Sequence, residues 1–287
     1  MHRLDRLRSN IRRCFYGNDD AIDKVIVCLL ARGHMLIEDV PGVGKTMLAT
    51  SLARSLDCTL ARIQLTPDML PADVLGVSVW DQHKGEFVFK PGPIFSNILL
   101  ADEINRTTPR TQSAMLEAMN ETQVSIDGRT HKLIEPFIVI ATQNPFEFEG
   151  TYFLPESQLD RFLVRVNLGY PKPEDEAKIL TTDPSRTALA DLKPVMTSED
   201  LVELQRQTEA VTIDRTLVDY IVRLAAATRS SEELQVGVSP RGSLALVRAA
   251  KGAAVLQGRD YVVPEDIVEN AVAVFAHRVV PKTYMHD

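Results

Sequence analysis

Short apolar runs alternate with longer amphipathic stretches over the first 169 residues of the chain. Five runs of aliphatic or β-branched residues are too short for helices and predict strands. These strands are expected at 35–39, 60–64, 98–102, 137–142 and 163–168. Helical periodicity predicts the segments that connect them. These helices are expected at about 18–32, 45–56, 109–121 and 155–162. Strands that alternate with helices indicate a parallel sheet covered on both faces, so this part of the chain is predicted to be α/β.

Two segments interrupt the alternation with a period of two around a turn. One pairs 77–80 with 87–90, and the other pairs 124–126 with 130–133 around an Asp-Gly turn. Both are predicted to be β-hairpins that serve as contact loops.

Pro171 and Pro173 break the chain, and no strand is predicted beyond them. Only amphipathic helices follow. They are expected at about 173–181, 197–209, 214–230, 240–256 and 264–277. We therefore expect an α/β domain over residues 1–170 and a smaller all-α domain over 171–287.

The composition of the 287 residues, 45% apolar and 25% charged, is ordinary for a globular protein. The net charge of −7 argues against a dedicated nucleic-acid-binding protein. The chain shows no signal peptide and no apolar run of about 18 residues, and its three cysteines share no metal-type spacing. We expect a cytoplasmic protein without a membrane span. Arginines near the N-terminus alternate with leucines at helical spacing, which indicates either a solvated helix face or a subunit contact.

The first predicted strand leads directly into a glycine-rich loop that ends in Lys45 and Thr46. Gly42 and Gly44 let the backbone approach a phosphate, so that successive N–H groups point into one concavity. Lys45 adds charge at the β- and γ-phosphates, and the Thr46 hydroxyl is a usual Mg²⁺ ligand. The strict pattern GxxxxGK(S/T) has glycine where this chain has Asp39. The loop predicts an ATP site. Its expected binding residues are Asp39, Val40, Pro41, Gly42, Val43, Gly44, Lys45, Thr46 and Met47.

The predicted strand at 98–102 ends in two acidic residues, Asp102 and Glu103. Ligands of open α/β sheets bind at this carboxyl edge. Asp102 is placed to hold Mg²⁺ together with Thr46, and Glu103 to polarise the water that attacks the γ-phosphorus. Because this strand follows a phosphate loop, the pair predicts ATP hydrolysis.

Four further polar residues are candidates for chemistry at the γ-phosphate. Asn144 follows the strand at 137–142, where it positions the attacking water or simply forms an Asn-Pro turn. Arg161 is either an arginine finger for a neighbouring subunit or a cap on its own helix, and Arg165 competes for the finger role. Arg241 stands in the first turn of a helix, where a cation is disfavoured unless an anion faces it.

Taken together, these motifs resemble those of the AAA+ ATPases and, within them, the MoxR family. The resemblance covers nearly the whole chain. It rests on Glu38–Thr46, Leu99–Arg106, Thr111–Met119, Ala141–Pro145, Leu159–Phe162 and Ser239–Arg241. It implies a P-loop parallel-sheet domain with inserted β-hairpins, followed by a small all-α lid. It also implies a ring, expected to be hexameric, with ATP between the subunits.

The same resemblance implies roles for individual residues. Asn144 corresponds to sensor 1, Arg241 to sensor 2 and Arg161 to the finger that acts in trans. Gly17 falls at the adenine pocket, and the two hairpins face the pore or the substrate.

The expected function is that of a chaperone-like motor that hydrolyses MgATP and remodels or matures a partner protein, often one with a von Willebrand A-type domain. The enzymatic alternative is the AAA+ subunit of a magnesium chelatase. A nucleic-acid motor is suggested only by Arg129, His131 and Lys132 on the second hairpin. A nucleotide-switched scaffold with little hydrolysis is the remaining alternative, and Glu103 and Arg161 argue against it.

Overall fold

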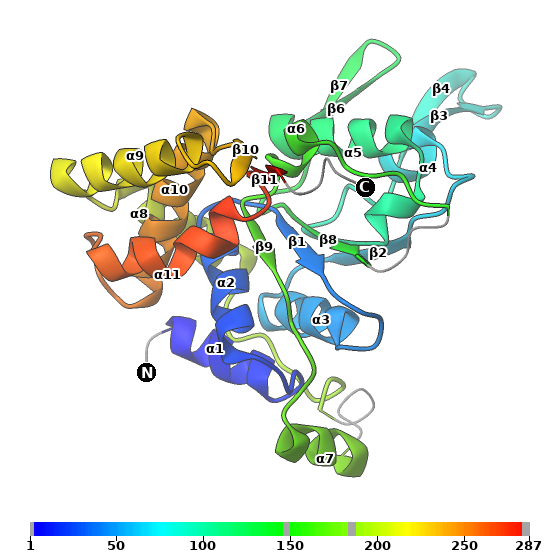
Figure 1. Cartoon of the computed structure of the whole chain (residues 1–287). Helices are drawn as coiled ribbons and strands as arrows, with labels where there is room; N and C mark the ends of the chain where they lie inside the picture. The colour runs from blue at the N-terminus through cyan, green and yellow to red at the C-terminus, as the bar shows by residue number, and fades with distance from the viewer. Residues whose placement is uncertain (1–2, 146–149, 183–187, 283–287) are drawn as a thin grey trace.

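The computed structural model describes residues 3–145, 150–182 and 188–282. A parallel sheet of five strands lies at its centre, in the order β2-β5-β8-β1-β9 (Figure 1). The strands are β1 (Met35–Glu38), β2 (Leu60–Gln64), β5 (Ile98–Asp102), β8 (Ile138–Gln143) and β9 (Val164–Val166). The five predicted strands are thereby confirmed.

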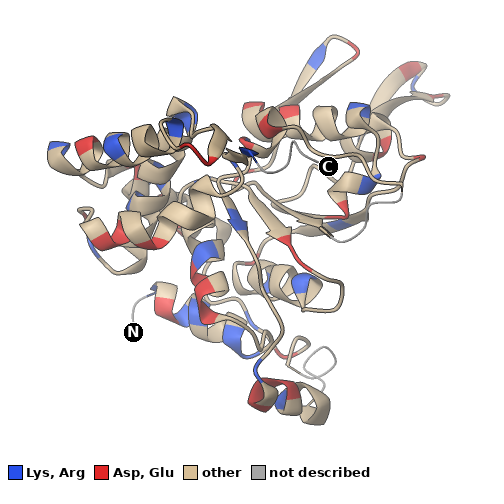
Figure 2. Ribbon diagram, viewed as in Figure 1, with Lys and Arg blue, Asp and Glu red and all other residues tan. Residues whose placement is uncertain are grey.

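Helices cover both faces of this sheet. Ile98 and Leu100 of β5 pack into the core beneath α1 (Arg3–Arg12), α2 (Asp19–Leu30) and α3 (Lys45–Ser55). Leu99 and Ala101 point the other way, into a second core beneath α4 (Pro71–Leu75) and α5 (Pro109–Glu121). The strands carry few charged residues, whereas the outer helices carry both signs (Figure 2). The fully buried β5 is what a sheet covered on both faces requires.

The two predicted hairpins are confirmed and project from one end of the molecule (Figure 1). They consist of β3 (Gly76–Asp81) with β4 (Glu86–Pro91), and of β6 (Gln123–Ile126) with β7 (Arg129–Lys132). Phe89 of the first hairpin stacks on His131 of the second, with ring centroids 4.0 Å apart. Trp80 and Phe87 of the first hairpin are 52% and 64% exposed.

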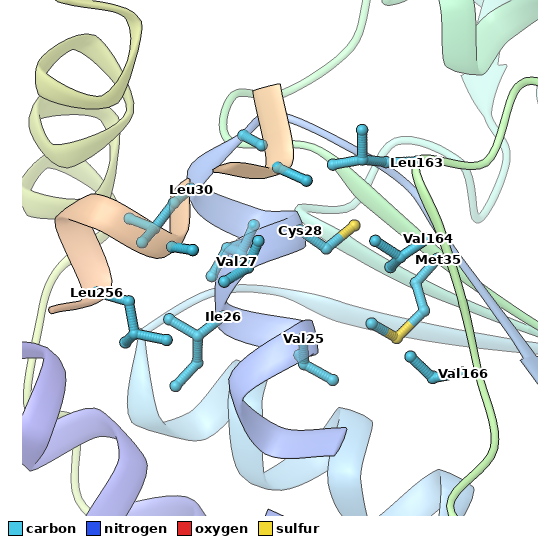
Figure 3. Packing of buried hydrophobic residues seen from close by; sticks show 14 of the residues in the cluster. Val25, Ile26, Val27, Cys28, Leu30, Met35, Leu163, Val164, Val166 and Leu256 are labelled. Carbon is cyan, nitrogen blue, oxygen red and sulfur yellow. The ribbon is translucent and has the colours of Figure 1, made fainter. Parts of the chain in front are cut away.

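The C-terminal helices pack on α2 and β9 and share their core. They are α8 (Ser198–Ala210), α9 (Arg215–Arg229), α10 (Pro240–Leu256) and α11 (Pro264–Phe275). Figure 3 shows α2 between Leu256 of α10 on one side and Met35 and Val164 of the sheet on the other. A Cβ on Gly252 would lie 2.9 Å from the carbonyl oxygen of Val27, so glycine permits this close crossing of α10 and α2. The division into domains at residue 170 stays a prediction.

The region after residue 170 differs from the prediction in two respects. A short antiparallel pair, β10 (Leu234–Val236) with β11 (Val280–Pro281), is present although no strand was expected. Strands of two or three residues are too short to show a period of two. The first helix, α7 (Pro173–Thr182), lies apart from α8–α11 and next to α1 and α3 (Figure 1).

The crossover helix expected at 155–162 is also shorter than predicted, since α6 covers only Glu156–Leu159. Arg161 therefore lies in the turn between α6 and β9. The five-residue α4 and the 3₁₀ turn at Ile104–Arg106 were not predicted.

Three of the arginines of α1, Arg3, Arg8 and Arg12, pair with acidic residues of the same chain. Arg8 lies 2.6 Å from Asp23, and Arg12 lies 2.8 Å from Asp19. This arrangement favours the solvated face over a subunit contact. No helix among the described residues is long and apolar enough to span a membrane.

Candidate nucleotide-binding site

The strand order brings the three predicted motifs to one edge of the sheet. β8 lies between β1 and β5, so Asn144 falls between the phosphate loop that follows β1 and the acids that end β5. All three strands are parallel, and their carboxyl ends therefore meet. A pocket of about 590 Å³ opens there. It is lined by Pro41, Gly42, Gly44, Lys45, Thr46, Met47, Thr50, Arg62, Gln64, Asp102, Glu103, Thr142, Asn144 and Leu189.

The phosphate loop has the backbone that anion binding requires. Gly42 and Gly44 have φ of 90° and 94°, in the region that favours glycine. Side chains cap the N-termini of α5, α9 and α10, whereas α3 begins at Gly44 with no side-chain cap. The dipole of α3 favours an anion at this end. The Lys45 ammonium donates to the carbonyl of Asp39 at 2.7 Å.

The two acids at the end of β5 are held by different partners. Asp102 is buried, and its carboxylate accepts from Arg62 Nε at 2.7 Å and from the Thr142 hydroxyl at 3.2 Å. Glu103 has φ 58° and ψ 54°, an uncommon conformation for a residue with a side chain. Its N–H donates to Thr142, and its carboxylate lies 3.0 Å from Arg106 Nε. Thr142 therefore links the two acids and fixes their relative orientation.

Four of the predicted binding residues do not line this pocket: Gly17, Asp39, Val40 and Val43. Val43 lines an adjoining pocket of about 140 Å³ together with Phe15, Tyr16, Pro171 and Ile179. This smaller pocket also contacts Gly42, Gly44 and Met47, so the two pockets are continuous along the loop. Gly17 lines neither pocket. A Cβ at this position would lie 2.5 Å from the Phe15 ring, so its bare backbone gives that ring room.

Arg161 and Arg241 lie together in a second pocket, of about 480 Å³. Its lining includes Gly33, Phe137 and Leu163, which precede β1, β8 and β9, so it opens at the amino ends of the strands. Neither arginine lines the phosphate-loop pocket of its own chain, so Arg241 does not lie where a sensor of that chain's own γ-phosphate was expected. The helix-cap alternative for Arg161 does not hold, because its Nη1 donates to Leu116 of α5 at 2.8 Å, not to α6. Its Nε is buried with no hydrogen-bond partner.

Asp160 connects these arginines to the C-terminal helices. Its carboxylate lies 2.7 Å from Arg278 Nε and 3.6 Å from Arg241 Nε. Arg278, which follows α11, is buried and also donates to the carbonyl of Phe162. These contacts attach the end of α11 to the turn that carries Arg161. Arg165, the competing finger candidate, pairs instead with Glu38 at 3.0 Å.

Sequence reasoning missed Arg62, Thr142 and Arg278. Thr142 ends a predicted strand beside the acids, and its polar side chain after an apolar run was the available signal. Arg62 and Arg278 reach partners 40 and 118 positions away, and no local pattern indicates such pairs.

The comparisons with known proteins agree with this geometry. Residues 34–164 match the ATPase family associated with various cellular activities (AAA), and residues 226–287 match the AAA lid domain. The uncharacterized protein YeaC of Bacillus subtilis is 49% identical over 276 residues, covering 96% of this chain and 86% of YeaC. Chaperone MoxR1 of Mycobacterium tuberculosis is 43% identical over 293 residues, covering 98% of this chain and 76% of that protein. A solved structure from Cytophaga hutchinsonii, named provisionally as an ATPase, is 37% identical with a TM-score of 0.91, covering 98% and 88% of the two chains.

Fold and site define a P-loop protein of the AAA+ class, with a nucleotide pocket at the carboxyl edge of a parallel sheet and a helical lid. Relatives that match over nearly the full chain narrow this class further. The chain belongs to the MoxR family of AAA+ ATPases.

Proposed function

We propose that this protein hydrolyses MgATP at the interfaces of a ring of subunits, with six as the expected number, and uses the energy to remodel a partner protein. One observation carries the proposal. The phosphate-loop pocket and the Arg161–Arg241 pocket open at opposite ends of the same strands. A four-residue strand such as β1 spans roughly 13 Å, so one chain does not bring both pockets to one phosphate. Two neighbouring chains in a ring do.

The residues of the first pocket fit MgATP. The uncapped N-terminus of α3 and the Lys45 ammonium bind phosphate oxygens. The Thr46 hydroxyl and the Asp102 carboxylate are oxygen donors on one wall, and Mg²⁺ takes its other ligands from phosphates and water, so this donor set suits it. Bound there, Mg²⁺ neutralises charge on the phosphates. The small pocket beside the loop, with Phe15 and Tyr16, receives the base.

The chemistry on the protein side is assigned to Glu103 and Asn144. Glu103 accepts the proton of the attacking water, in an orientation fixed by the hydrogen bond of its N–H to Thr142. Asn144 lines the same pocket and orients that water or contacts the γ-phosphate.

The arginines act on the neighbouring subunit's nucleotide. Arg161, which lines the second pocket, stabilises charge that develops on the γ-phosphate, and Arg241, 64% exposed, contacts the same phosphate. Asp160 lies against both Arg241, on α10, and Arg278, just after α11. Hydrolysis at the neighbouring subunit's nucleotide is therefore transmitted to both helices. Arg165 is already paired with Glu38, which favours Arg161 as the finger.

The partner is proposed to be a protein, with a von Willebrand A-domain protein as the first candidate. The name chaperone of MoxR1 supports a protein client. The exposed Trp80 and Phe87 on the first hairpin offer an apolar surface for it. Nucleic acid fits less well because the net charge is −7. The cytoplasm is the proposed location.

The test is ATP turnover per mole of protein over a wide range of protein concentration. Specific activity is expected to rise steeply and then saturate, because sites are completed between subunits. Flat and appreciable activity would place all catalytic groups in one chain and overturn the role of both arginines in trans. Turnover near zero at every concentration would favour the nucleotide-switched scaffold.

A further inference from the structure

Both carboxylate oxygens of Asp39, the residue that opens the phosphate loop, accept hydrogen bonds from backbone N–H groups. Its Oδ2 accepts from the N–H groups of Leu168 and Gly169, both at 2.7 Å, and its Oδ1 accepts from its neighbour Val40 at 2.9 Å. Hydrogen bonds to a carboxylate are among the stronger ones in proteins. The three N–H groups also compensate the negative charge of the carboxylate, which would otherwise repel a triphosphate bound nearby. This explains how an acid is tolerated where the strict loop pattern has glycine.

Leu168 and Gly169 begin the segment that carries α7, here called the arm and defined as the described residues 168–182 and 188–195. Pro171 and Ile179 of the arm line the small pocket beside the phosphate loop. None of the residues of α7 is buried, so its own packing holds it weakly in place. Its position therefore depends on how the ends of the arm are fastened.

The far end of the arm is fastened to α3. The carbonyl of Leu189 accepts from Arg54, and the N–H of Val195 donates to the carbonyl of Ser55 at 2.9 Å. α3 is the helix whose N-terminus forms the phosphate site. One end of the arm is thus attached to the phosphate loop through Asp39. The other end is attached to the last residues of α3, the helix that follows this loop.

We infer that Asp39 clips the arm to the phosphate loop and thereby positions the wall of the pocket that receives the nucleotide base. Asp39 is a positioning residue in this scheme. It holds the phosphate loop and the arm at a fixed distance from each other, so that the phosphates and the base of one nucleotide are bound at the same time. The inference rests on the proposed nucleotide site and adds a specific role for a residue that the loop pattern does not require.

Two substitutions of Asp39 test the clip. Asp39→Gly restores the strict loop pattern and removes the carboxylate, and Asp39→Asn keeps the shape but has one acceptor oxygen in place of two. Asp214→Asn is the matched control, because Asp214 also accepts from a backbone N–H, that of Thr216 at 2.8 Å, at the start of α9. Thermal melting confirms that each variant folds, and Asp39→Asn stands in if Asp39→Gly does not.

The first measurement is hydrogen exchange of the full-length protein without nucleotide. We expect faster exchange at 168–182 in Asp39→Gly, by about tenfold or more at residues 168 and 169, an intermediate effect in Asp39→Asn and none in Asp214→Asn. Unchanged exchange in both Asp39 variants would overturn the clip. This result does not depend on any nucleotide being bound.

The second measurement compares the affinities for MgADP and for Mg-tripolyphosphate, which has phosphates but no base. We expect Asp39→Gly to weaken MgADP by about tenfold and tripolyphosphate by less than about twofold. Equal weakening of both would assign Asp39 to phosphate binding and overturn the inference. If the wild type binds neither probe, the proposed function fails, while the exchange data still decide whether the clip exists.

Discussion

The pockets at the two ends of the parallel strands differ in their charged residues. The pocket at the carboxyl ends has the glycine loop, Lys45, Arg62 and two acids. The pocket at the amino ends has no phosphate loop and is lined by five arginines and three acids: Arg32, Arg161, Arg241, Arg248, Arg278, Glu121, Glu135 and Asp160. Under the proposed function, the first pocket binds ATP and activates water, and the second stabilises charge on the neighbouring subunit's nucleotide. Each chain of the proposed ring would then supply two half-sites.

The largest effect is expected from Arg161→Ala. Turnover at saturating ATP and protein should fall by roughly 10³–10⁵, the value of an arginine finger, while ATP affinity in the chain's own pocket persists. Steady-state ATPase assays and nucleotide-binding titrations measure both. Arg165→Ala is the matched control, and a full loss there with an active Arg161→Ala would exchange their roles.

Mixing subunits separates action in trans from action in cis. A ring of Arg161→Ala and Glu103→Gln subunits contains interfaces that pair an intact Glu103 with an intact Arg161, so mixtures should recover activity that neither variant has alone. No recovery at any ratio would mean that Glu103 and Arg161 act within one chain and would contradict the two half-sites.

Glu103→Gln should reduce turnover by roughly 10²–10⁴, because the carboxylate that accepts the proton is lost. ATP binding should be unchanged, since Lys45 and the loop remain. Single-turnover hydrolysis and binding titrations distinguish the two steps. Glu117→Gln, an exposed position on α5, is the control, and wild-type turnover in Glu103→Gln would remove Glu103 from the mechanism.

Acid should destabilise the wall of the second pocket through His34. The ring is buried, donates from Nε2 to the carbonyl of Met119 and accepts at Nδ1 from the N–H of Val139, which holds it neutral. Burial lowers the pKa of His34 to about 4. The unfolded chain, with an ordinary pKa near 6.5, therefore binds the proton first, and stability is lost as the pH falls from about 6.5 to about 4.

The loss at pH 5 should be on the order of 1–2 kcal/mol for His34 alone. Urea unfolding at pH 7 and pH 5 measures it. His34→Gln should reduce the pH dependence of the free energy of unfolding. His83→Gln, at an exposed position, should leave it unchanged. Burial also lowers the pKa of His277, to about 3, so part of the dependence should survive in His34→Gln.

The smallest effect is expected from Arg62→Gln. Arg62 neutralises Asp102 at 2.7 Å, and its side chain is 54% exposed, so the pair is worth roughly 0.2–1 kcal/mol. Removing it should lower the Mg²⁺ concentration needed for half-maximal ADP binding by about fivefold at most. Mg²⁺ titration of nucleotide binding measures the shift, with Arg206→Gln as the control. A higher Mg²⁺ requirement would show that Arg62 helps to hold the nucleotide.

Much of the fold was predictable because it depends on local patterns. The five strands, both hairpins and the start of α2 at Asn18 follow from periodicity, turn residues and caps that act within a few positions. The predictions that were wrong concern elements whose formation depends on distant contacts. The pair β10 with β11 joins segments more than forty residues apart, and neither strand is long enough to be read alone.

The phosphate loop, the start of α3 and the acids that end β5 could be predicted from the sequence, because each is a short contiguous motif whose backbone and charge requirements are local. Their arrangement, and the position of the arginines, depends on tertiary structure. Strand order places Asn144 between the loop and the acids, and the packing of α10 places Arg241 beside Arg161 at the opposite end of the strands. The fold also gives Asp39 partners 129 and 130 positions away. These contacts arise from the packing of helices on both faces of the sheet, which joins distant segments regardless of their local sequence.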